Sequence, residues 1–153
     1  MERMFKLARM PIYVLPQPEY RPVCGSDAVE LTKRFQFQGF DLPIGFRWDG
    51  QTIPRLFWFF VGHPMAPRSM AGSLIHDELY RKGYIVDPQS GEHYPISRVR
   101  ADGIFYDVCK LYAGADNARN WWERLKLVAP IYLKYRGLRF GGWYAWSQFR
   151  NGN

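Results

Sequence analysis

The sequence predicts an α+β fold, a small N-terminal antiparallel sheet packed on two or three helices, in a single domain spanning residues 1–153. Short β-prone runs between Pro and Gly residues fill the first third, and two helical patterns follow. The length suits one domain that buries about 70% of the surface exposed by the unfolded chain. Hydrophobic residues make up 47% of the chain and aromatic residues 18%, which is enough apolar area to offset the entropy cost of ordering.

The charge balance is basic, with 21 Lys and Arg against 14 Asp and Glu and a formal net charge of +7. Such a charge favours nucleic acid, anionic lipid or an acidic assembly partner, and does not choose among them. Cys24 and Cys109 lie far apart and form no metal-ligand spacing. We therefore expect two reduced thiols rather than a disulfide scaffold or a structural zinc site.

The longest apolar run, residues 56–61, is far shorter than the roughly 20 residues that cross a bilayer. The N-terminus also lacks the apolar core of a signal peptide. We predict no transmembrane segment, and we expect the protein in the cytoplasm of a host cell or in a virion assembled there.

Short strands joined by tight turns are expected over residues 13–48. The dipeptide Asp49-Gly50 favours a turn that reverses the chain. After it, Thr52 can cap a helix that has Pro54 in its first turn. The run over residues 56–61 fits a short helix or a buried strand equally well.

A helix is predicted over residues 67–83, because five apolar side chains recur on one broad face and Gly83 supplies a stop. Those side chains are Met70, Ala71, Leu74, Ile75 and Leu79. Ser73, His76 and Tyr80 share the opposite flank, and Asp77 and Glu78 interrupt the apolar face, so we expect burial on several sides.

A loop or irregular hairpin is expected over residues 83–95, followed by a helix capped by Ser97 that runs to Tyr112. A third helix is expected over residues 117–128, before Pro130 disturbs the helical pattern. The aromatic, Arg-rich tail over residues 132–146 is expected to cover one side of the domain.

Two carboxylates, Asp77 and Asp102, fall at the margins of apolar helical faces, where an unpaired charge is costly. If the two helices pack antiparallel, His76 and Tyr80 come near both of them. An imidazole beside a carboxylate can act as a general base or join a metal site. A satisfied structural network is the alternative, and Arg98, four residues before Asp102, suits an internal salt bridge.

The candidate catalytic residues are thus His76, Asp102, Asp77 and Tyr80, and the candidate substrate-binding residues are Asp49, Thr52 and Arg98. A divalent cation is the one cofactor considered, with Asp77 as its candidate ligand. The basic aromatic tail could stack on bases and pair with phosphates, but a core-covering segment or a protein interface is the favoured interpretation.

Several ordered motifs resemble a phage and prophage family defined only as domain of unknown function 1353. They are Pro43-Ile44-Gly45-Phe46, then Asp49 with Thr52-Ile53-Pro54-Arg55, then His76-Asp77-Glu78-Leu79-Tyr80, then Ser97-Arg98 with Ala101-Asp102 and Phe105, with a weaker echo in Phe140-Gly141-Gly142-Trp143. Thr52 stands where that family more often has Ser, which keeps the hydroxyl. The resemblance implies a phage origin and no particular reaction.

The segment from His76 to Tyr80 also resembles the His-Asp-x-x-Tyr helix of secreted phospholipases. That resemblance implies His76 as base, Asp77 as calcium ligand and Asp102 as the group that orients the base. The flanking disulfide cysteines and the Gly-rich calcium loop of those enzymes have no clear counterpart in this sequence, so the resemblance supplies a template for mechanism only.

Two function classes follow. The first is a small phage-encoded hydrolase with a His/Asp site. The second is a structural virion protein, a tail or capsid accessory, whose basic aromatic tail contacts other virion proteins. Nucleic-acid binding, which would give salt-sensitive retention on DNA, is possible but not favoured.

Overall fold

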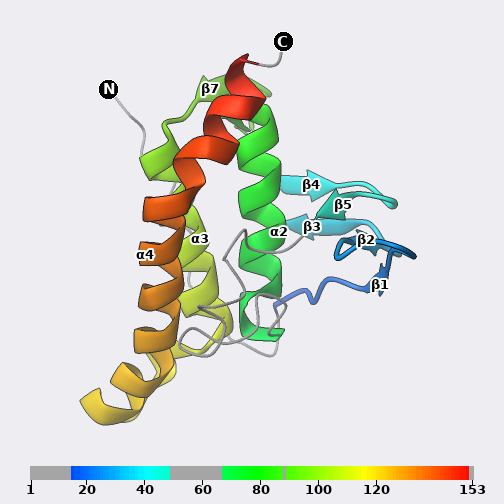
Figure 1. Ribbon diagram of the computed structural model, residues 1–153. Helices are drawn as coiled ribbons and strands as arrows, with labels where there is room; N and C mark the ends of the chain where they lie inside the picture. The colour runs from blue at the N-terminus through cyan, green and yellow to red at the C-terminus, as the bar shows by residue number, and fades with distance from the viewer. Residues whose placement is uncertain (1–14, 49–66, 88, 152–153) are drawn as a thin grey trace.

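The computed structural model describes residues 15–48, 67–87 and 89–151 and has the predicted α+β architecture (Figure 1). Strands β1–β5 lie on one side of helix α2, helices α3 and α4 lie on the other, and the β6–β7 hairpin lies at the end of the molecule where α2 ends. The elements are β1 (Tyr20–Pro22), β2 (Val29–Leu31), β3 (Phe35–Phe37), β4 (Phe40–Leu42), β5 (Arg47–Trp48), α2 (Pro67–Lys82), β6 (Tyr84–Val86), β7 (His93–Pro95), α3 (Arg98–Tyr112), the 3₁₀ turn η3 (Ala115–Asn117) and α4 (Trp121–Asn151).

The N-terminal strands form two small antiparallel sheets rather than one. Strands β1, β2 and β5 make the first, and the β3–β4 hairpin makes the second. Phe35 and Phe37 are buried on either side of an exposed residue, and β4 repeats this alternation. Gln38 and Gly39, at the hairpin loop, both have positive φ, which suits the twist of a two-residue connection.

Helix α2 is buried on nearly every side. Its predicted apolar face, including Leu74 and Ile75, packs into the core with the strands. The opposite flank, which carries His76 and Tyr80, is buried as well, because α3 and α4 pack against it. Burial on several sides is therefore confirmed, and the polar groups on that flank need partners inside the protein.

Helix α3 follows the β6–β7 hairpin and returns antiparallel to α2 (Figure 1). Ser97 is its N-cap, as predicted, and the Ser97 hydroxyl accepts a hydrogen bond from the Arg100 amide. Gly72 allows α2 and α3 to approach closely, because a Cβ at that position would collide with Sγ of Cys109. The residues around Asp102 are thus held against the middle of α2.

Helix α4 corrects the sequence prediction. The expected third helix over residues 117–128 is instead a 3₁₀ turn followed by a 31-residue helix that continues through Pro130 to residue 151. A proline inside a helix costs about 3 kcal/mol. Ile131 and Leu138, which follow it, are buried, and each such side chain contributes about 1.5–3 kcal/mol, so tertiary packing outweighs the break.

Among the described helices, none has both the length and the hydropathy that a membrane span requires, in agreement with the prediction for this part of the chain. The predicted helix or strand over residues 56–61 lies outside the described residues.

Candidate functional site

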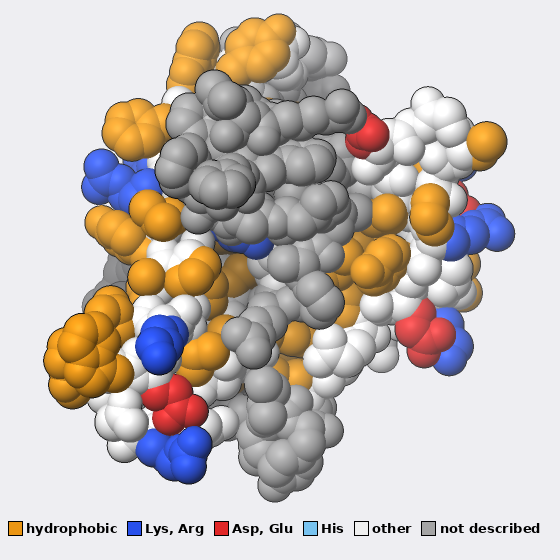
Figure 2. All heavy atoms as spheres, turned by 60° about the horizontal axis from the view of Figure 1, so that its bottom comes forward, with side chains coloured by type: hydrophobic (Ala, Val, Ile, Leu, Met, Phe, Trp, Pro, Cys, Tyr) orange, Lys and Arg blue, Asp and Glu red, His pale blue; other side chains and the backbone are white. Residues whose placement is uncertain are grey.

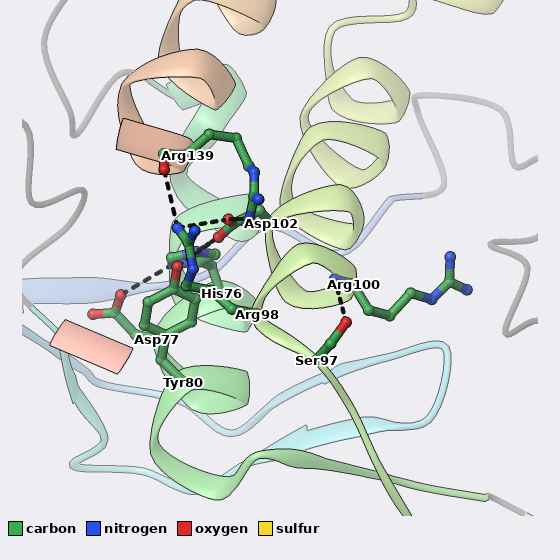
Figure 3. A network of polar contacts seen from close by, with 8 residues as sticks. All are labelled: His76, Asp77, Tyr80, Ser97, Arg98, Arg100, Asp102 and Arg139. Carbon is green, nitrogen blue, oxygen red and sulfur yellow. Dashed lines mark hydrogen bonds and ion pairs between the residues drawn. The ribbon is translucent and has the colours of Figure 1, made fainter. Parts of the chain in front are cut away.

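Three predicted site residues, His76, Tyr80 and Asp102, meet between α2 and α3 (Figure 3). His76 and Tyr80 are four residues apart and so lie on one flank of α2. Asp102 lies in the first turns of α3, which runs antiparallel beside that flank. The antiparallel pairing of two helices therefore brings together groups that are 26 residues apart in the chain.

Asp102 is the centre of the network and has a relative exposure of 0%. Its Oδ1 atom lies 2.9 Å from Nε2 of His76 and accepts a hydrogen bond of 2.6 Å from the Tyr80 hydroxyl. Its Oδ2 atom accepts a hydrogen bond of 2.8 Å from Arg139 and lies 3.7 Å from Nη1 of Arg98. Both oxygens of a fully buried carboxylate are thus satisfied.

Helix α4 completes the network with residues that the sequence analysis did not assign to the site. Arg139 binds Asp102, and its backbone carbonyl accepts a hydrogen bond of 3.1 Å from Arg98. At Gly142 a Cβ would lie 2.5 Å from the Tyr80 hydroxyl oxygen. The Trp146 ring packs edge-on against Tyr80, with ring centroids 5.1 Å apart.

The sequence held a weak signal for these residues. Gly141 and Gly142 interrupt an aromatic, Arg-rich segment, and a glycine within a helix can mark a close approach, although the same pair and Pro130 disfavour a helix there. Arg139 precedes Gly142 by three residues, so both project from one side of α4.

The electrostatics of the network favour an ionised carboxylate. Burial raises the pKa of Asp102, but hydrogen bonds from His76, Tyr80 and Arg139 outweigh burial and hold its pKa below the ordinary value. Burial lowers the pKa of His76, but the carboxylates of Asp102 and Asp77 outweigh it and raise the pKa above 6.5. Burial and the bond to Asp102 raise the pKa of Tyr80, so its hydroxyl keeps its proton and donates.

These contacts fix the proton arrangement of the histidine. Because Asp102 is ionised and can only accept, Nε2 of His76 must carry the proton that it donates. In the neutral ring, Nδ1 then holds the lone pair. Nδ1 faces Oδ1 of Asp77 at 3.8 Å. A base that a carboxylate orients through its other nitrogen is the arrangement found in catalytic triads and in metal-binding histidines.

The remaining predicted residues do not all join this cluster. Asp49 and Thr52, the candidate substrate-binding residues, lie outside the described residues. Arg98 contacts Asp102 through an ion pair and α4 through a hydrogen bond. His93 stacks on Tyr84 in the β6–β7 hairpin, with ring centroids 4.3 Å apart, away from the network.

The described residues alone do not supply a metal site. Within residues 15–48, 67–87 and 89–151, no group of three or more His, Cys, Asp or Glu side chains is arranged to hold a metal ion. Asp77 is accompanied by His76, whose Nε2 is engaged by Asp102. Metal binding at Asp77 therefore stays a prediction from the resemblance to phospholipases.

Together these features define an α+β domain in which a buried His–Asp–Tyr–Arg network joins three helices. The chain belongs to the family described as protein of unknown function (DUF1353), whose model matches residues 27–123. The match includes both helices that carry His76 and Asp102 and ends at the start of α4, so Arg139 and Gly142 lie beyond it. Comparisons with curated proteins and with solved structures found no match.

Proposed function

We propose that the protein is a hydrolase in which His76 is the general base. The observation that carries this proposal is the orientation of the imidazole between two carboxylates. Asp102 lies 2.9 Å from Nε2 and Asp77 lies 3.8 Å from Nδ1, so a neutral ring that donates from Nε2 has its lone pair on Nδ1. A general base needs a lone pair on the nitrogen that does not bind the orienting carboxylate, and this tautomer supplies one.

In the proposed step, Nδ1 of His76 takes a proton from a water molecule while the water oxygen attacks an acyl or phosphoryl centre of the substrate. The leaving group then receives that proton from the imidazolium. Asp102 stabilises the imidazolium, and Tyr80 positions Asp102 by donating to the same oxygen. Asp77, beside Nδ1, binds a polar substrate group or a cation, and we assign no step to a metal.

The raised pKa of His76 sets the pH dependence of this reaction. The base must be neutral to accept a proton, so the rate should rise with pH through a value above 6.5. Replacing Asp102 with Asn should lower the pKa of His76 and move the acid limb of the profile to lower pH.

The test compares His76→Gln with His93→Gln, a matched change at the exposed stacked histidine, in assays of chromogenic carboxylic and phosphoric esters. We expect His76→Gln to reduce the rate by about 10²–10⁴-fold, with His93→Gln unchanged. Equal rates for the two variants on every ester that the wild-type protein cleaves would refute the proposal. Long-range ¹H–¹⁵N NMR of the neutral histidine supplies a readout without substrate, since a proton on Nδ1 would also refute it.

A second candidate is a virion protein in which the same network is purely structural. The burial of His76 and Asp102, at 4% and 0% exposure, favours this alternative, because the two residues at the centre of a network that joins three helices are closed to solvent. The test is to measure the protein composition of purified virions, in which this chain should occur at a fixed stoichiometry. Recovery of the chain only outside particles would exclude it.

A further inference from the structure

Helix α4 has two apolar sides, and in the part of the chain that the structure describes, residues on only one of them are buried. Its inward side, which includes Ile131 and Leu138, packs against α3. Eight large side chains project outward within a sector of about 140°, and we call them the outer aromatic face. They are Trp121, Trp122, Leu125, Tyr132, Leu133, Phe140, Trp143 and Tyr144, all exposed. A surface helix usually directs its apolar side chains to the core and its polar ones to solvent, so a second apolar side is a candidate contact surface.

The outer aromatic face exposes more apolar area than the apolar patches on most monomeric proteins. Phe140 is 73% exposed, and Trp121 and Trp143 are each above 60%. Six of the eight are aromatic side chains of about 150–250 Å² each, and with the two leucines the face exposes on the order of 800 Å². The largest apolar patch of a typical monomer is about 300–600 Å², so this face is sized for an interaction.

The charges on α4 favour an anionic partner. The helix contains six Lys and Arg residues and a single acidic residue, Glu123. Arg124, Lys126 and Arg136 are exposed, and the Arg136 guanidinium lies 5.4 Å from the centre of the Phe140 ring. Pairing two copies of this helix would bring like charges together. In Figure 2, hydrophobic side chains with Lys and Arg among them gather on the left of the molecule.

The shape of the face favours a lipid surface over a protein. The exposed rings follow one 31-residue helix, about 46 Å long, along an outer edge of the molecule (Figure 1). Trp and Tyr beside Lys and Arg suit the headgroup region of a bilayer.

We propose that the outer aromatic face of α4 binds the surface of an anionic lipid bilayer, with the helix lying in the plane of the headgroups. The aromatic rings enter the boundary between headgroups and acyl chains, and the basic side chains pair with anionic headgroups. The inward side of α4 stays on α3 and keeps Arg139 at Asp102. This binding does not depend on hydrolysis at His76.

The test uses the full chain and sedimentation with vesicles of phosphatidylcholine, with or without phosphatidylglycerol. We expect binding to the anionic vesicles, weaker binding to the neutral ones, loss of binding at high salt and a blue shift of Trp fluorescence. The double variant Phe140→Ala/Trp143→Ala should bind about ten-fold more weakly or worse. Alanine suits an exposed helix position, so this variant should fold.

The matched control removes two exposed apolar side chains elsewhere, in Ile44→Ala/Tyr94→Ala, which are 67% and 45% exposed. This control should bind like wild type. The proposal is overturned if anionic vesicles fail to bind the chain at low salt or if both double variants bind equally. It is also overturned if the chain is a dimer that Phe140→Ala/Trp143→Ala dissociates. His76→Gln should bind vesicles normally, which keeps this result separate from the test of hydrolysis.

Discussion

Replacement of Asp102 by Asn tests whether the buried network stabilises the fold. An amide places one nitrogen where the carboxylate has an oxygen, so the side chain cannot accept from the His76/Tyr80 side and from Arg139 at once. Breaking a buried pair costs about 3–5 kcal/mol. The Arg139 side chain is about a quarter exposed, which reduces its share, so we expect a loss of about 3 kcal/mol.

The assay is urea unfolding at neutral pH followed by far-ultraviolet circular dichroism, together with thermal unfolding. For a protein of this size, about 3 kcal/mol corresponds to a decrease of about 9 °C in Tm. The matched control is Asp107→Asn, the same change on the same helix at a half-exposed side chain that pairs with Lys110 at 3.5 Å. It should cost at most about 0.5 kcal/mol. A difference below about 1 kcal/mol between the two variants would show that the network contributes little stability.

Three further outcomes are expected. Gly142→Ala should destabilise the protein by about 1–3 kcal/mol, because the new Cβ would meet the buried Tyr80 hydroxyl. The control Gly137→Ala adds a Cβ in open space, so it should be neutral or stabilising by up to about 1 kcal/mol. Urea unfolding curves measure the free energy of unfolding of both variants. The pKa of His76 is raised in the folded protein, so its contribution to stability is complete below pH 6.5 and is lost as the pH rises through the folded-state pKa. The stability advantage of wild type over His76→Gln should therefore shrink as the pH is raised above 6.5. Cys24 is exposed and Cys109 is buried with a raised pKa, so a thiol reagent should modify one thiol in the native protein and two in urea.

The central helices could be predicted from the sequence because their signals are local. The apolar spacing of α2 and the Ser97 cap of α3 each lie within a few turns. The contact between His76 and Asp102 could also be predicted, because polar groups at the margins of two neighbouring apolar helical faces need hydrogen-bond partners and can supply them to each other. The structure places these two side chains 2.9 Å apart.

Helix α4 could not be predicted, because local preferences and tertiary contacts conflict there. Pro130 and the pair Gly141–Gly142 disfavour a helix, and the burial of Leu138 against α3 overrides them. Arg139 could not be assigned to the site for the same reason, since its place depends on the helix that carries it. The split of the N-terminal strands into two sheets is likewise a matter of long-range pairing.

The distance in sequence between Asp102 and Arg139, 37 residues, bears on the order in which the protein assembles. A chain made from its N-terminus completes α2 and α3 before Arg139 exists. Until α4 packs, the carboxylate lacks the Arg139 hydrogen bond, one of the three that lower its pKa. A chain that ends after α3 would therefore hold Asp102 with a higher pKa than the complete protein does.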